Sequence, residues 1–166
     1  MNDAHYHLVV NHFPIIGTIF GLGILIVGLV FKKETLQTTA YVLFCIAALT
    51  GFLAMYTGEG AEELVEDLPS VGHRIIHEHE EIAEKFAILV YALGGFSLLT
   101  IFLNAKKSSF AKMVAYFTLL LALVATFVGK EVGTSGGEIR HTEIRATATA
   151  SSQAADQATE SAEEGE

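Results

Sequence analysis

Seven histidines mark the parts of this chain that could do chemistry. Imidazole rings bind metal ions and haem iron, and they exchange protons near neutral pH. The histidines lie next to long apolar stretches, and they are His5, His7, His12, His73, His77, His79 and His141. If those stretches cross a membrane four times, all seven histidines lie on one side of it. Of the 19 acidic residues, only Glu34 then lies on the other side.

The composition indicates an integral membrane protein. The chain has 166 residues and is 51% hydrophobic, yet its net charge is -9. Charged and apolar residues are segregated along the chain, which is typical of membrane proteins. The acidic balance gives no basic surface for nucleic acid. The only cysteine, Cys45, lies within an apolar stretch and has no partner for an intrachain disulfide.

Four apolar stretches are long enough to cross a bilayer as helices, which takes about 20 residues each. They lack the polar stripe that a soluble helical bundle would show. The expected spans run from about Phe13 to Phe31, Thr39 to Tyr56, Ile82 to Leu103 and Ala111 to Val128. Residues 1–145 are therefore predicted to form an all-α integral membrane four-helix bundle, up-down-up-down. The acidic tail, 146–166, has no large apolar residue and is predicted to be disordered.

Basic residues in the short loops predict the orientation in the membrane. One loop carries Lys32 and Lys33, and the other carries Lys106, Lys107 and Lys112. Short loops rich in lysine face the cytoplasm, so both termini and the histidines are predicted to face outward from a bacterial inner (cytoplasmic) membrane. The N-terminus lacks the basic region and cleavage site of a signal peptide.

The two halves of the chain resemble each other. Each half has a histidine-bearing approach, at 7–13 and 77–86, followed by an inward helix and a lysine loop. A returning helix then ends in a segment rich in Thr, Gly and Glu, at 57–63 and 134–141. Duplication of one helical hairpin would explain this arrangement.

The approach to the third span could hold a metal ion. Four of its residues recur at helical intervals of three and four, which places them on one helix face: His73, His77, Glu80 and Glu84. Imidazole with carboxylate suits Zn, Fe or Mn, and Glu59 and Glu138 could add ligands or orient a histidine. Pro69-Ser70 suits a helix start, with Ser70 as N-cap. The alternative is a solvated, charged extension of the helix.

The first span begins with two further candidates, His7 and His12. His12 lies at the mouth of a long apolar helix, where ionisable groups are costly and usually functional. His7 lies five residues earlier, so a straight helix would separate the two side chains by about 140°. They would then serve different centres, or one would orient the other. The alternative for His12 is an interfacial ring among lipid head groups.

The opening of the first span resembles a known family. The run 7–15, H-x4-H-F-P-I, is similar to the opening of an uncharacterised bacterial membrane family, the domain of unknown function twenty-two thirty-one. The exits Thr57-Gly58 and Gly136-Gly137-Glu138 are similar to that family's exits, and the likeness covers about 1–145. His141 lies three residues after Glu138, which is closer than the family pattern leads one to expect. The resemblance implies a four-helix membrane protein, and the fusion of some relatives to iron–sulfur domains suggests redox work.

Three functions are compatible with these residues. The first is a b-type haem protein for electron transfer, with His12 and either His77 or His79 as axial ligands and His7 as a further candidate. The second is a non-haem metal protein using the His73–Glu84 segment. The third is a non-catalytic subunit whose acidic outer face docks a redox protein or another basic partner. A channel is disfavoured because the helix interiors carry no ionisable residue at mid-depth.

Overall fold

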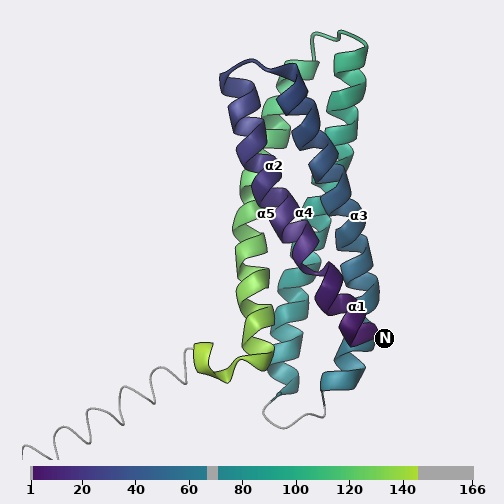
Figure 1. Cartoon of the computed structure of the whole chain (residues 1–166), viewed down its shortest axis with the longest axis vertical. Coiled ribbons are helices and arrows are strands. Elements are labelled where there is room, and N and C mark those ends of the chain that lie inside the picture. The colour runs from purple at the N-terminus through teal and green to yellow at the C-terminus, as the bar shows by residue number, and fades with distance from the viewer. Residues whose placement is uncertain (1, 67–70, 146–166) are drawn as a thin grey trace, which may run out of the picture.

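Four long helices run side by side and alternate in direction (Figure 1). A computed structural model describes residues 2–66 and 71–145. The long helices are α2 (His12–Val30), α3 (Glu34–Val65), α4 (His73–Ala105) and α5 (Ala111–Arg140). A short helix, α1 (Asp3–Val10), precedes α2, and a 3₁₀ turn, η1 (Thr142–Ile144), follows α5. The described residues contain no strand, so the predicted all-α four-helix bundle is confirmed.

The distribution of side chains confirms that the bundle belongs in a membrane. All four long helices are long and apolar enough to span a bilayer. Large apolar side chains face outward, as Phe20, Leu49 and Phe127 do with 63–67% of each exposed. The interior is instead rich in small residues, among them Ala40, Ala47, Ala122 and Ala125. Large apolar side chains on the outer surface and many small residues inside suit a bundle solvated by lipid.

The helices are longer than the apolar stretches that the sequence analysis identified. The Thr57-Gly58 and Gly129 exits do not end a helix, because α3 continues to Val65 and α5 to Arg140. The 33 residues of α4 measure about 50 Å, whereas the bilayer core is about 30 Å thick. The charged ends of the helices therefore extend beyond the membrane-spanning segments. Gly72 precedes α4 as its N-cap. The predicted N-cap Ser70 and the predicted disordered tail lie outside the described residues.

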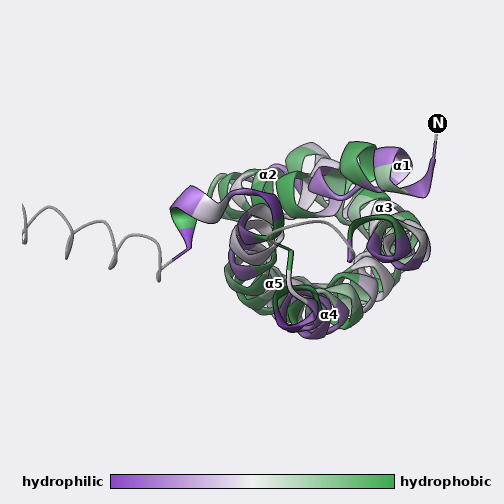
Figure 2. Ribbon diagram, turned by 90° about the horizontal axis from the view of Figure 1, so that it is seen from below, coloured by the Kyte–Doolittle hydropathy of each residue, from purple (hydrophilic) through white to green (hydrophobic). Residues whose placement is uncertain are grey.

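The two hairpins share one packing register. In the first hairpin, every seventh residue along α1 and α2 lies opposite every seventh residue along α3. The pairs are His7–Gly58, Pro14–Gly51, Gly21–Phe44 and Gly28–Gln37. The second hairpin repeats this with His79–Gly136 and Phe86–Gly129 between α4 and α5. This register places His7 and His79 at equivalent positions of the two hairpins. Figure 2 views the four helices from the end that carries these two residues, which we call the histidine end.

Candidate functional site

His7 and His79 are partly buried histidines at equivalent positions of the two hairpins. His7 lies on α1, which leads into α2, and His79 lies near the start of α4. Each faces a glycine on the returning helix of its hairpin. A Cβ atom added to Gly58 would lie 3.7 Å from Cε1 of His7, and one added to Gly136 would lie 3.0 Å from Cε1 of His79. The glycines therefore make room for an imidazole ring between two helices.

One ring nitrogen of His7 is fixed by the neighbouring helix. Its Nδ1 lies 3.0 Å from the carbonyl oxygen of Ala54 and 3.4 Å from Oγ1 of Thr57. A carbonyl oxygen can only accept, so Nδ1 carries the proton and donates it to Ala54. In the neutral ring, Nε2 then keeps its lone pair.

His79 repeats this arrangement with a hydroxyl group. Its Nδ1 lies 2.9 Å from Oγ of Ser135, and that hydroxyl lies 3.2 Å from the carbonyl oxygen of Val132. Because the serine proton is donated to Val132, the serine oxygen accepts the Nδ1 proton of His79. Nε2 of His79 is again the nitrogen with a free lone pair.

Both rings favour the neutral form, and they are close enough for a charge on His7 to act on His79. They precede the apolar stretches of their helices, so they lie outside the membrane-spanning segments. Burial lowers the pKa of His7, a hydrogen bond to Ala54 acts against this, and the neighbouring His12 lowers the pKa further. Burial also lowers the pKa of His79, and the charge of His7 adds to that effect. The site thus offers two neutral imidazoles, one from each hairpin, with Nε2 available as a ligand.

A family match covers the whole of this four-helix region. Residues 5–145 match a family described as a predicted membrane protein, DUF2231. The chain belongs to the DUF2231 family. The match confirms the resemblance carried by the H-x4-H-F-P-I opening. No match was found among the curated proteins or among the solved structures.

Two polar residues of this DUF2231 site were not singled out from the sequence. Asn11 lies one turn after His7, and its amide oxygen Oδ1 is buried without a hydrogen-bond partner. Ser135 holds His79. Matching the two glycines that face the histidines, Gly58 and Gly136, places Ser135 over Thr57, so the returning helices of the repeat contain the signal for Ser135. Asn11 has no polar counterpart, because matching His7 with His79 places Ala83 there.

The other predicted ligands lie outside this pair. His12 is exposed at the start of α2. The His73 side chain is 77% exposed and lies 3.7 Å from Glu66. The His77 side chain is 72% exposed and lies 3.9 Å from Glu80 and 3.5 Å from Glu81. Glu59 and Glu84 are exposed, and Glu138 is partly buried. Within the described ranges, no three His, Cys, Asp or Glu residues gather where they could hold a metal ion. The structure therefore does not assemble the predicted His73–Glu84 segment into such a group.

Glu62 and Glu80 join the two hairpins at the same end of the bundle. Their side chains share a hydrogen bond between α3 and α4, outside the membrane-spanning segments. Burial raises the pKa of Glu80 to about 7, and the contact with Glu62 and the charge of Glu84 act in the same direction, while His77 opposes them. One proton is therefore shared between the two carboxyl groups below neutral pH.

Glu80→Gln is expected to stabilise the protein at pH 8 more than at pH 5. The folded protein binds the Glu80 proton more tightly than the unfolded chain does. The Glu80 contribution to stability therefore falls as the pH rises from about 4.5 to about 7. The gain at pH 8 should be at most about 1 kcal/mol, because the side chain is 41% exposed and solvent screens the repulsion. Thermal unfolding at both pH values measures it, with exposed Glu63→Gln as control. An equal effect of Glu80→Gln at both pH values would contradict the shared proton.

Proposed function

We propose that this protein binds b-type haem at the histidine end, with His7 and His79 as the axial ligands, and transfers electrons at that membrane surface. The observation that carries the proposal is the repeated geometry of the two histidines. Each donates Nδ1–H to a group on the returning helix and keeps the Nε2 lone pair. A hydrogen bond from the other ring nitrogen fixes the orientation of an imidazole ligand and raises its basicity.

The number of ligands favours haem over a single bound ion. Haem iron in a helical bundle takes two axial nitrogen ligands from facing helices, because the porphyrin supplies the other four. Zn, Fe or Mn held directly by protein needs three or more side chains. The part of the chain that the structure describes offers no group of three such residues. It offers instead two imidazoles held in the same way, His7 and His79. Gly58 and Gly136 lie beside the two rings and would permit close approach of a flat cofactor.

The position of the pair limits the path of the electrons. All described histidines lie towards one end of the bundle, so the chain supplies ligands for haem at one membrane surface only. The expected reaction is oxidation of a membrane quinol to the quinone, which releases two protons and two electrons. The electrons would leave one at a time to an acceptor protein at the same surface. The lysines in the short loops predict that this surface is the outer face of a bacterial inner membrane.

A visible spectrum of the full-length protein, purified in mild detergent, tests the proposal. We expect a Soret band that shifts on reduction with dithionite, and about one haem per chain by pyridine haemochrome assay. Apoprotein supplied with haemin should recover the same spectrum. A colourless protein that carries stoichiometric Zn, Fe or Mn by elemental analysis would favour the non-haem alternative. A protein that neither contains haem nor takes it up would overturn the proposal.

A further inference from the structure

Both hairpins turn on a lysine in a backbone conformation that favours glycine. Lys32 and Lys107 have φ angles of 53° and 52°. Each directly follows the C-cap residue of a helix. The backbone N–H of the residue after each lysine donates to a carbonyl oxygen in the last turn of the helix, Lys33 to Gly28 (2.8 Å) and Ser108 to Leu103 (2.9 Å). These are Schellman motifs, in which the left-handed position is usually glycine. A charged residue in that position at both turns points to a role for the charge.

The turns belong to a basic surface, which we call the lysine end. It comprises Lys32, Lys33, Lys106, Lys107 and Lys112, and Glu34 is its only acidic residue. All five lysines are exposed. None of them forms an ion pair with another described residue, although Nζ of Lys106 lies 5.7 Å from the ring centre of Phe102. With one acidic residue among five lysines, most of this positive charge is available to an external anion.

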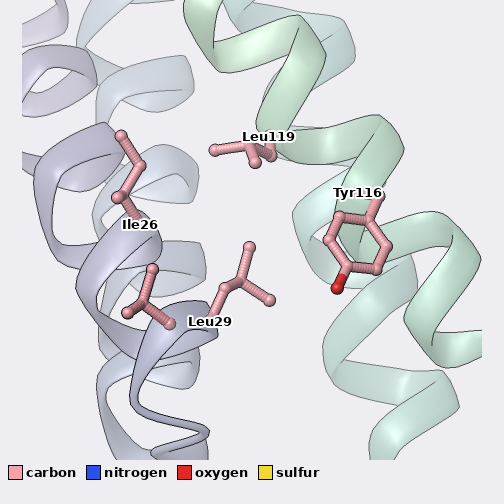
Figure 3. A pocket seen from close by; sticks show the side chains of 5 residues that line it. Ile26, Leu29, Tyr116 and Leu119 are labelled. Atoms are coloured by element: carbon pink, nitrogen blue, oxygen red, sulfur yellow. The ribbon is translucent and has the colours of Figure 1, made fainter.

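An apolar groove opens beside this surface, between α2 and α5 (Figure 3). It has a volume of about 220 Å³ and is lined by Ile26, Leu29, Val30, Tyr116 and Leu119. Figure 3 shows Leu29 on α2 and Leu119 on α5 projecting towards the space between the two helices. Lys32 and Lys33 directly follow Val30, and Lys112 lies one turn before Tyr116 on the same helix face. The groove therefore has basic residues next to its water-facing end.

We propose that the lysine end and the α2–α5 groove form a binding site for an anionic phospholipid. The phosphate of the head group would lie against Lys32, Lys33 and Lys112. One acyl chain would lie in the groove against Leu29 and Leu119.

The chemistry of the site favours this occupant over others. The groove lies between helices that span the membrane, so hydrocarbon chains surround it. Membrane proteins often place tyrosine at the level of the head groups. Tyr116 is 62% exposed and lies one turn from Lys112. A zwitterionic lipid would leave the excess positive charge unmatched, whereas an anionic lipid neutralises it. A second copy of this chain would bring the same five lysines towards the first and would be repelled.

Binding of two lipids with identical acyl chains tests the proposal. The full-length protein is titrated in a neutral detergent with phosphatidylglycerol or phosphatidylcholine, and bound lipid is counted by native mass spectrometry. We expect phosphatidylglycerol to bind at least tenfold more tightly, because each lysine near the head group contributes about fivefold. The triple variant Lys32→Gly, Lys33→Gln, Lys112→Gln should lose this preference. Glycine at position 32 keeps the turn, so the fold is retained.

Two further variants separate the head group from the groove. Lys85→Gln with Lys130→Gln removes two lysines near the histidine end and should leave the lipid preference unchanged. Leu119→Trp fills the groove and should reduce retention of both lipids without changing the charge. Far-UV circular dichroism and gel filtration of each variant check the fold.

Several results would overturn the proposal. Equal affinity for the two lipids would do so, as would a triple variant that still prefers phosphatidylglycerol. Displacement of the lipid by an equal concentration of inorganic phosphate would show that the lysines bind phosphate alone. A dimer that dissociates in Leu119→Trp would assign the groove to a second copy of the chain.

Discussion

His7→Ala and His79→Ala should each abolish the low-spin haem spectrum of the purified protein, whereas His12→Ala and His77→Ala should retain it. Removing an axial ligand leaves haem iron with an open position, which changes the Soret band and weakens retention of the cofactor. His12 and His77 are exposed and do not share the fixed Nδ1 geometry. The comparison therefore decides between the pair favoured by the structure and the pair predicted from the sequence, His12 with His77 or His79.

The groups that hold the two rings give a second, graded test of the same site. Ser135→Ala removes the acceptor of the His79 Nδ1 proton, and loss of such an orienting partner typically weakens cofactor or metal affinity 10- to 100-fold. Haem titration into the apoprotein of this variant measures the effect. Thr134→Ala is the matched control, because Thr134 is exposed and its hydroxyl donates to Lys130 of its own helix (3.1 Å). If His12→Ala lost the spectrum while His7→Ala kept it, the assignment of His7 would be wrong.

Much of the fold could be predicted from the sequence, because a membrane imposes simple rules on it. Stretches such as Phe13–Phe31 contain too few polar residues for any structure except a lipid-exposed helix, and the two lysine loops separate the helices into hairpins. The helix ends were harder to predict. Thr57-Gly58 and Gly129 reduce hydropathy and helix propensity, yet tertiary contacts with His7 and Phe86 keep these segments helical.

The candidate site was only partly predictable, because helix register decides which histidines meet. The sequence identified His7 and His79 among four candidates at the helix entrances. It could not separate them from His12 and His77, since all four lie close to an apolar stretch. The register does separate them: His7 and His79 lie opposite glycines, whereas His77 points outward beside Glu80 and Glu81. Separations across the bundle depend on helix packing, which one sequence does not specify.

Gly94→Ala should destabilise the protein, whereas Gly95→Ala should be neutral or stabilising. A Cβ atom on Gly94 would lie 2.7 Å from Cβ of Ala48 and 3.6 Å from the carbonyl oxygen of Phe44. Neither neighbour is the flexible end of a side chain, so α3 and α4 must move apart at a cost of about 1–3 kcal/mol. A Cβ atom on Gly95 would meet nothing within 4 Å, and alanine favours the helix over glycine by up to about 1 kcal/mol.

The two neighbouring positions make this a controlled measurement, because each variant adds one methyl group at the same depth of the same helix. The thermal unfolding temperature in detergent, followed by circular dichroism, should fall for Gly94→Ala and stay the same or rise for Gly95→Ala. Equal shifts would show that α3 and α4 do not pack through Gly94. The α3–α4 contact joins the two hairpins, and each hairpin supplies one of the site histidines. Gly94→Ala is therefore also expected to weaken haem retention, even though Gly94 lies fifteen residues along α4 from His79.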